Sequence, residues 1–342
     1  MSSHQLLSVQ SAFAALHPFL SRLGLQPGTE DEVSKRLEEL ERALEGYKKK
    51  GQKTKIGNEG EGGDEGWFDS AGVTLWNAVM HFDRTLQDGA SPRSQLSARI
   101  RLIAYRMIQM SMQSSNTPTA LNRLLIVVSK TVSAQISVGK IDAARELLVE
   151  AAEYEDMLDK YFSPGDRDLN LIRPLLEFYL ARVRVSAAED NHDMSLGFLR
   201  KALELGHSGA FEADQYRNLA NECWMVGNQL IAQVLADHKD PEGLIAHSNE
   251  WLSLGRRIVE EGIARFGNVP GFEELQKALL RSLGLPFLLD FALALINTAR
   301  CCLLPSSQDP EALAKGTSAL QELAALSDPQ ASHEPDTNKC SD

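Results

Sequence analysis

"DNHDMSLGFLRKALEL", residues 190–205, predicts a helix with an unusual apolar face. Ser195, Leu199 and Ala202 are spaced by four and then three residues, so they share one side of a helix. The polar residues before them favour a turn and a helix start. Large side chains at all of these positions would bury more apolar area than the small ones do. The small residues therefore indicate that another helix approaches closely at this face.

A second stretch, "GKIDAARELLVEAAEY" at residues 139–154, repeats the pattern. The turn residue Gly139 is followed after five positions by Ala144, then by Leu148 and Ala151 at the same spacing of four and three. This arrangement resembles the second helix of a tetratricopeptide repeat, where small residues admit the paired helix and a bulky one fills the groove against the next hairpin.

The distance between the two turns departs from that repeat. The turn positions 139 and 190 are 51 residues apart, whereas a tetratricopeptide repeat has a period of about 34 residues. We therefore expect long, irregular repeats. An unrelated helical bundle is the alternative interpretation.

The composition agrees with a helical chain. Hydrophobic residues make up 43% of the 342 residues and aromatic residues only 6%, while leucine and alanine dominate the apolar set. No alternating strand pattern is present. The sequence predicts an all-α fold, a tetratricopeptide-like array of helical hairpins. Four regions are expected: N-terminal helices over 1–47, a flexible charged linker over 48–66, a helical repeat domain over 67–304, and a polar, largely disordered tail over 305–342 with one short helix.

Two segments have a second interpretation. The expected linker begins with five lysines between positions 48 and 55 and continues with a glycine-rich acidic run. The lysines are interpreted as part of a solvated linker, with a nuclear import signal or a phosphate contact as the alternative. The apolar stretch 283–304 contains Pro286, Asp290 and Arg300, so it favours a buried helix over a membrane span.

The charge balance narrows the class of partner. Lysine and arginine number 35 and aspartate and glutamate 47, which gives a net charge of −12. Such an acidic chain is a poor candidate for direct binding to nucleic acid, which requires a basic face. The four cysteines form no CxxC pair, which indicates a reducing compartment. The N-terminus lacks the basic start and apolar run of a signal peptide.

The sequence offers no constellation typical of catalysis, so we expect no enzyme, cofactor or metal site. His192 lies among three acidic residues, a cluster better explained as a solvated turn. The adjacent Cys301 and Cys302 are interpreted as core residues. Arg182 and Arg184, on an otherwise apolar helix, fit either a peptide-binding groove or local pairing and packing, and the second is favoured.

Five stretches carry a resemblance to a known family. They are "LWNAVMHFDR" (75–84), "ARIRLIAYRMI" (98–108), "VGKIDAARELLVEAAEYEDML" (138–158), "EFYLARVRVSAAEDNHDMSLGFLRKA" (177–202) and "EWLSLGRRIVE" (250–260). Their order is similar to the meiotic Zip-four family, called Spo-twenty-two in fungi, over about residues 67–283. The shared motifs are packing patterns, and the repeat near Trp251 matches the tetratricopeptide pattern poorly. Members of the family are much longer, so this chain would be an N-terminal portion, a truncated member or a divergent short form.

The resemblance implies a function. It implies a non-enzymatic scaffold in the nucleus, on meiotic chromosomes, that promotes crossover formation and synapsis together with other meiotic chromosome proteins. The alternative is a general tetratricopeptide-like adaptor or complex subunit without a meiotic role. Under either interpretation we expect protein partners, and no membrane, nucleic acid or small-molecule substrate.

Overall fold

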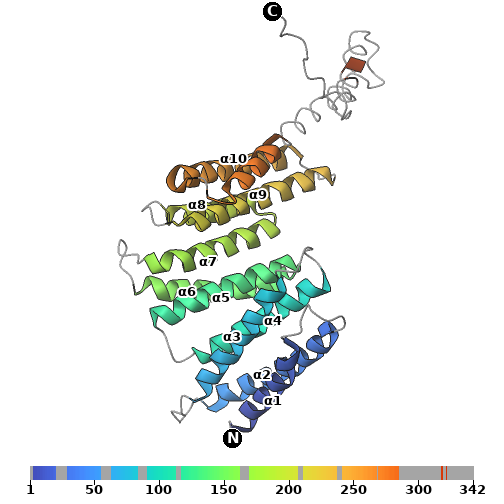
Figure 1. The fold of residues 1–342 in the computed structure, drawn as a ribbon, viewed down its shortest axis with the longest axis vertical. Helices are drawn as coiled ribbons and strands as arrows, with labels where there is room; N and C mark the ends of the chain where they lie inside the picture. The colour runs from blue at the N-terminus through green and yellow to red at the C-terminus, as the bar shows by residue number, and fades with distance from the viewer. Residues whose placement is uncertain are drawn as a thin grey trace, which may run out of the picture. The chain divides into compact units, whose positions relative to one another are not determined.

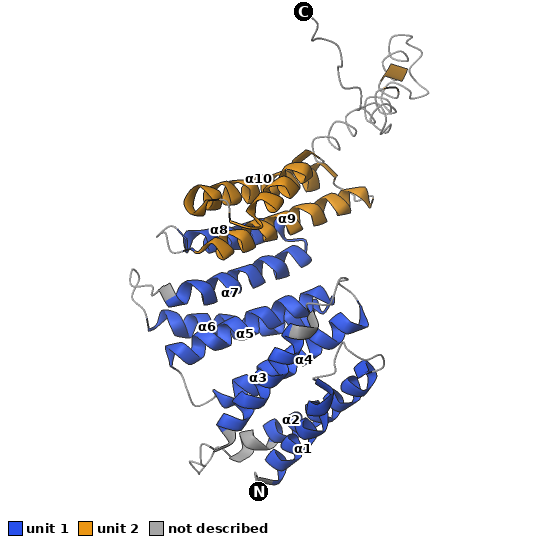
Figure 2. Cartoon of the chain, viewed as in Figure 1, with its two compact units in different colours: residues 1–211 blue, residues 212–342 orange. Residues whose placement is uncertain are grey.

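The computed structural model describes residues 3–20, 29–54, 63–83, 91–112, 117–161, 169–206, 211–236, 241–267, 269–284, 317–318 and 321. Every regular element within these ranges is helical, and none of them contains a strand. The chain divides into two compact units, residues 1–211 and 212–342 (Figure 2). The division falls inside the region 67–304 that the sequence analysis treats as one domain. Each unit is described by itself.

The first unit is built from sequential helical hairpins (Figure 1). Its helices are α1 (Ser3–Leu20), α2 (Thr29–Thr54), α3 (Gly63–Asp83), α4 (Pro92–Ser111), α5 (Pro118–Ser137), α6 (Ile141–Asp159), α7 (Leu169–Ala188) and α8 (His192–Glu204). Each odd-numbered helix packs on the next even-numbered one. Neighbouring hairpins also touch, through α1 and α3, α2 and α4, and α5 and α7. The predicted all-α hairpin array is therefore confirmed at this level.

The second unit contains one further hairpin. Helix α9 (Ala213–Leu235) packs along α10 (Pro241–Phe266), and a helical segment follows over 272–284. Trp251, the largest fully buried side chain, lies in α10. The apolar stretch 285–304 and nearly all of the tail 305–342 lie outside the described residues.

The expected linker over 48–66 is helical wherever the structure describes it. Helix α2 continues to Thr54 and α3 begins at Gly63, while 55–62 lie outside the described residues. Lysine and glutamine favour helix, so α2 continues beyond its last buried leucine. Tyr47 of α2 lies against Phe68 of α3, with ring centroids 5.1 Å apart. The two helices that flank residues 55–62 are therefore in contact at this point.

Local sequence signals set the starts of the central helices. Ser91 precedes α4, and its hydroxyl accepts a hydrogen bond from the Ser94 amide at 3.2 Å. Thr117 caps α5 in the same way. A proline follows each of these caps at the first helical position, where its missing N–H is not needed.

The turns inside two hairpins have the same backbone geometry. Gly139 and Asp190 have φ angles of 75° and 56°, in the left-handed region. Each donates its N–H to the carbonyl three residues earlier, at 2.9 Å and 3.1 Å. The following residues, Lys140 and Asn191, donate to the carbonyl five residues earlier, at 2.9 Å and 2.8 Å. This is the Schellman termination of a helix, and it occurs at the two turn positions aligned from the sequence.

Candidate partner-binding groove

The four small residues of the repeat pattern are all fully buried. Ala144 and Ala151 on α6, and Ser195 and Ala202 on α8, have no exposed surface. The Ser195 hydroxyl donates a hydrogen bond to the backbone carbonyl of Val183 on α7, at 2.9 Å. A side chain can reach a carbonyl of the paired helix at that distance only if the two helices approach closely. The small residue at position 195 is explained by this contact.

The bulky positions behave differently in the two hairpins. Leu199 on α8 is fully buried, as a groove-filling residue should be. Leu148 on α6 is only half-buried, and its neighbour Leu147 occupies the buried position instead. The small positions of α6 therefore match the aligned pattern, and only the bulky position is shifted by one residue.

A third hairpin carries the same small-large-small spacing. On α10, Ser248, Leu252 and Gly255 are spaced by four and three and are buried. The Ser248 hydroxyl donates to the backbone carbonyl of Gly227 on α9 at 3.0 Å, the counterpart of the Ser195 contact. Sequence reasoning missed this match because it looked for the repeat around Trp251. The small-large-small spacing begins at Ser248, three residues before Trp251.

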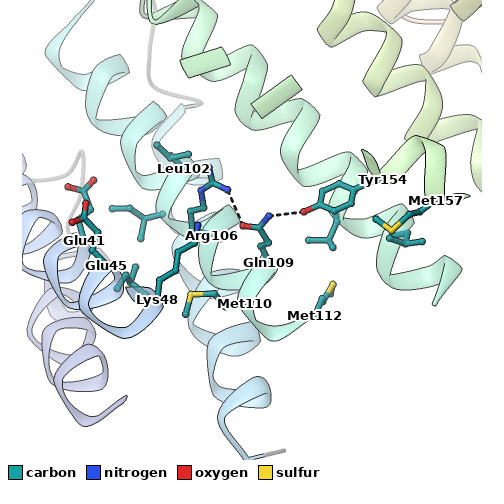
Figure 3. Close-up of a pocket in the computed structure, with 14 residues that line it drawn as sticks. Glu41, Glu45, Lys48, Leu102, Arg106, Gln109, Met110, Met112, Tyr154 and Met157 are labelled. Atoms are coloured by element: carbon teal, nitrogen blue, oxygen red, sulfur yellow. Dashed lines mark hydrogen bonds between the residues drawn. The ribbon is translucent and has the colours of Figure 1, made fainter. Parts of the chain in front are cut away.

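A cavity of about 500 Å³ opens among the second helices of the first three hairpins (Figure 3). Its lining comes from α2, α4 and α6, with additional leucines from the start of α5. Apolar residues dominate this lining and include three methionines, Met110, Met112 and Met157. We call this cavity the groove. None of the repeat positions lines it.

Arginines of α4 join the walls of the groove. Helix α4 carries four arginines and no acidic residue. Arg99 donates to both carboxylate oxygens of Glu41 on α2, and Arg106 donates to Glu150 on α6 at 2.6 Å. Arg99 and Arg106 of α4 are therefore paired within the protein, and these ion pairs connect α4 to α2 and to α6.

One carboxylate oxygen of Glu150 organises the polar end of the groove. It accepts hydrogen bonds from the Tyr105 hydroxyl at 2.6 Å, from Arg106 at 2.6 Å and from Gln109 at 2.9 Å. The Gln109 amide also donates to the Tyr154 hydroxyl at 2.8 Å (Figure 3). These bonds run between α4 and α6, so they fix the position of one groove wall.

The electrostatics of this cluster keep its protonation constant near neutral pH. Burial alone would raise the pKa of Glu150, but hydrogen bonds from Arg106 and Tyr105 outweigh it and hold the pKa below its ordinary value. Burial raises the pKa of the Tyr105 and Tyr154 hydroxyls. Glu150 is therefore ionised while both phenols are protonated. A cluster in this state serves as a structural connection between helices.

Arg182 and Arg184 of α7 make packing and pairing contacts outside the groove. The Arg182 guanidinium lies 4.9 Å from the ring centroid of Phe178 and 4.8 Å from that of Phe198. Arg184 donates to the Ser133 hydroxyl at 2.6 Å. The favoured interpretation of these arginines, local pairing and packing, is confirmed.

The described part of the chain contains neither a metal-binding cluster nor a membrane-spanning helix. Within it, no group of three or more His, Cys, Asp or Glu side chains is arranged to hold a metal ion. No helix there has the length and apolar character needed to cross a bilayer. His192 begins α8, next to the capping residue Asn191, and Cys301 and Cys302 lie outside the described residues.

Comparison with known proteins gave no match to a family model, a curated protein or a solved structure. The resemblance to the meiotic Zip-four family stays a prediction.

Proposed function

We propose that this protein is a non-enzymatic scaffold that binds segments of other proteins. The observation that carries the proposal is the groove, an apolar cavity of about 500 Å³ spread over three hairpins of the first unit. Helical-hairpin arrays present extended surfaces suited to protein segments. Cavities of this size and apolar lining are also typical of binding sites.

The lining favours binding over further internal packing. Methionine is flexible and polarizable, so a methionine-rich surface adapts to different apolar side chains. The charges on the floor are already paired within the protein, as with Arg106 and Glu150 at 2.6 Å. A partner would therefore gain apolar contact without having to neutralise a buried charge.

We further propose that the scaffold acts in meiosis, in the nucleus, where it promotes crossover formation and synapsis with other meiotic chromosome proteins. The basis of this part is the sequence resemblance. The net charge of −12 supports recruitment through proteins instead of through direct contact with DNA.

The test combines a groove variant with a gene deletion. Met157 lines the groove and is half-buried, so Met157→Glu should weaken co-purification of partners from meiotic cells while the protein stays folded. Deletion of the gene should leave vegetative growth normal and reduce crossovers and the viability of spores or gametes. Normal meiosis with impaired vegetative growth would instead support the general adaptor. If partners co-purify equally well with the Met157→Glu variant, the assignment of the groove as the binding site is contradicted.

A further inference from the structure

We propose that the groove binds a basic amphipathic α-helix of a partner protein. This inference rests on the scaffold function proposed above and names the occupant of the same site. Three features support it: acidic side chains on both walls, an apolar floor between them, and walls whose backbone groups are already hydrogen-bonded.

The α6 wall carries unpaired acidic residues in line with the groove. Glu146, Glu150, Glu153 and Met157 are spaced by four, three and four, so they form one stripe of the helix. Met157 lines the groove, and Glu150 is bound by Arg106 at its polar end. Glu146 and Glu153 are exposed, and neither has an ion-pair partner among the described residues. They are placed to receive cations from an occupant.

The α2 wall has a matching stripe. Glu38, Glu41, Glu45 and Lys48 are spaced by three, four and three, and the last three line the groove. Arg99 binds Glu41 and lies 3.7 Å from Glu38, and Lys49 lies 3.8 Å from Glu45. The side chains of Glu38 and Glu45 are 59% and 70% exposed, so these two ion pairs are open to solvent. Lys48 is the one cation of this stripe, at its C-terminal end.

The two walls together present a surplus of negative charge. The surplus comes from α6, where Glu146 and Glu153 have no ion-pair partner among the described residues. The glutamates of the α2 stripe are paired with Arg99 and Lys49, and Glu150 is paired with Arg106. Acidic walls around an apolar floor complement a helix with one apolar face and basic flanks. The charge would contribute specificity and association rate, and the methionine-lined floor most of the affinity.

The groove also favours a helix over an extended peptide. Its walls are helices whose backbone groups bond internally, so they provide no edge to pair with an extended chain. An occupant must satisfy its own backbone, as a helix does. Helices pack about 8–10 Å apart, so walls on either side of α4 lie roughly 16–20 Å from each other. A helix about 10 Å across fits between them.

The experiment uses the full chain and a labelled synthetic amphipathic helix with a leucine face and lysine flanks. Fluorescence anisotropy should report saturable binding that weakens with added salt. A sister peptide with glutamate flanks should bind at least tenfold more weakly. The double variant Glu146→Lys/Glu153→Lys should also lose about tenfold in affinity, the equivalent of 1.4 kcal/mol, and Met157→Glu should lose more.

Matched controls lie outside the groove. Glu260→Lys/Glu274→Lys makes the same charge change on exposed sites of the second unit, and Met194→Glu places a charge at a methionine that is 51% exposed. Both controls should bind the lysine peptide within twofold of the unsubstituted protein. Circular dichroism of every variant verifies that it is folded.

The outcomes separate the occupant from the scaffold. Equal binding of both peptides, or equal loss in groove and control variants, would overturn the basic-helix proposal. If natural partners still depend on Met157 in that case, the scaffold function stands and only the chemistry of the occupant is wrong. Self-association of the protein that Met157→Glu abolishes would assign the groove to a second copy and would also overturn the proposal.

Discussion

The close approach of helices at the small repeat positions can be tested with two glycines. A Cβ added at Gly255, in α10, would lie 2.8 Å from the Cβ of Cys223 and 2.9 Å from Leu279. It would also lie 3.3 Å from the backbone oxygen of Ala220. A Cβ and a backbone oxygen cannot rotate away, so α9 and α10 must separate. A Cβ added at Gly197, in α8, would meet nothing within 4 Å.

The two substitutions should therefore change stability in opposite directions. Gly255→Ala introduces overpacking that costs about 2–3 kcal/mol, the upper part of the usual range, because the new Cβ would lie less than 3.0 Å from two side chains. About 1 kcal/mol of improved helix propensity offsets this cost. The expected net destabilisation is about 1–2 kcal/mol. Gly197→Ala gains propensity without a clash and should stabilise α8 by about 0.5–1 kcal/mol.

Native-state hydrogen exchange, read by mass spectrometry, measures the two units separately. Amides of α9 and α10 should exchange roughly 5–30 times faster in Gly255→Ala, because 1.4 kcal/mol corresponds to a factor of ten. Amides of α7 and α8 should exchange more slowly in Gly197→Ala. If the amides of α9 and α10 exchange as slowly in Gly255→Ala as in the unsubstituted protein, the inferred close approach of the two helices is wrong.

Three other predictions follow from packing and hydrogen bonding. Ala151→Leu and Ala202→Leu should each destabilise the protein by about 1–3 kcal/mol, because both sites are fully buried; an unchanged urea midpoint in both would reject the alignment of α6 with α8. Ser195→Ala should cost about 1 kcal/mol in the same assay, because it removes a buried hydrogen bond between α8 and α7, and a midpoint equal to that of the parent would contradict the contact. Glu150 has a pKa below its unfolded value, so its stabilisation is present above about pH 4.3 and is lost as the pH falls through the lower folded pKa. Glu150→Gln should flatten that acid dependence. If the urea midpoints of the variant and of the unsubstituted protein change in parallel with pH, Glu150 does not contribute to it.

The hairpins were predictable because their signals are local. Each turn needs a residue that tolerates a positive φ angle, and glycine and aspartate are such residues at 139 and 190. Small residues at fixed spacing then mark the face that meets the paired helix, as Ser195 and Ala202 do. Turn, spacing and burial all lie within about sixteen residues of chain.

The groove was not predictable, because its lining is assembled from distant segments. Met110 and Met157 look like ordinary apolar positions in the sequence, and only the stacking of hairpins brings them to one cavity. The connection of Arg106 to Glu150 spans 44 residues of chain and two helices. The linker prediction was incomplete for a related reason, since a run of lysines with no apolar face carries no periodic signal, although lysine itself favours helix.

Helix α6 shows why packing signals and functional signals must be tested separately. Ala144 and Ala151 lie on its buried face, while Glu146 and Glu153 are exposed. A separation of two residues turns about 200° around a helix, so the acidic residues point away from the face that fixes the hairpin. Packing within the hairpin does not require particular side chains on that outer face. The small buried residues therefore support the hairpin array, whereas the proposed partner binding depends on residues outside that packing face. Substitutions at Glu146, Glu153 and Met157 are the ones that test it.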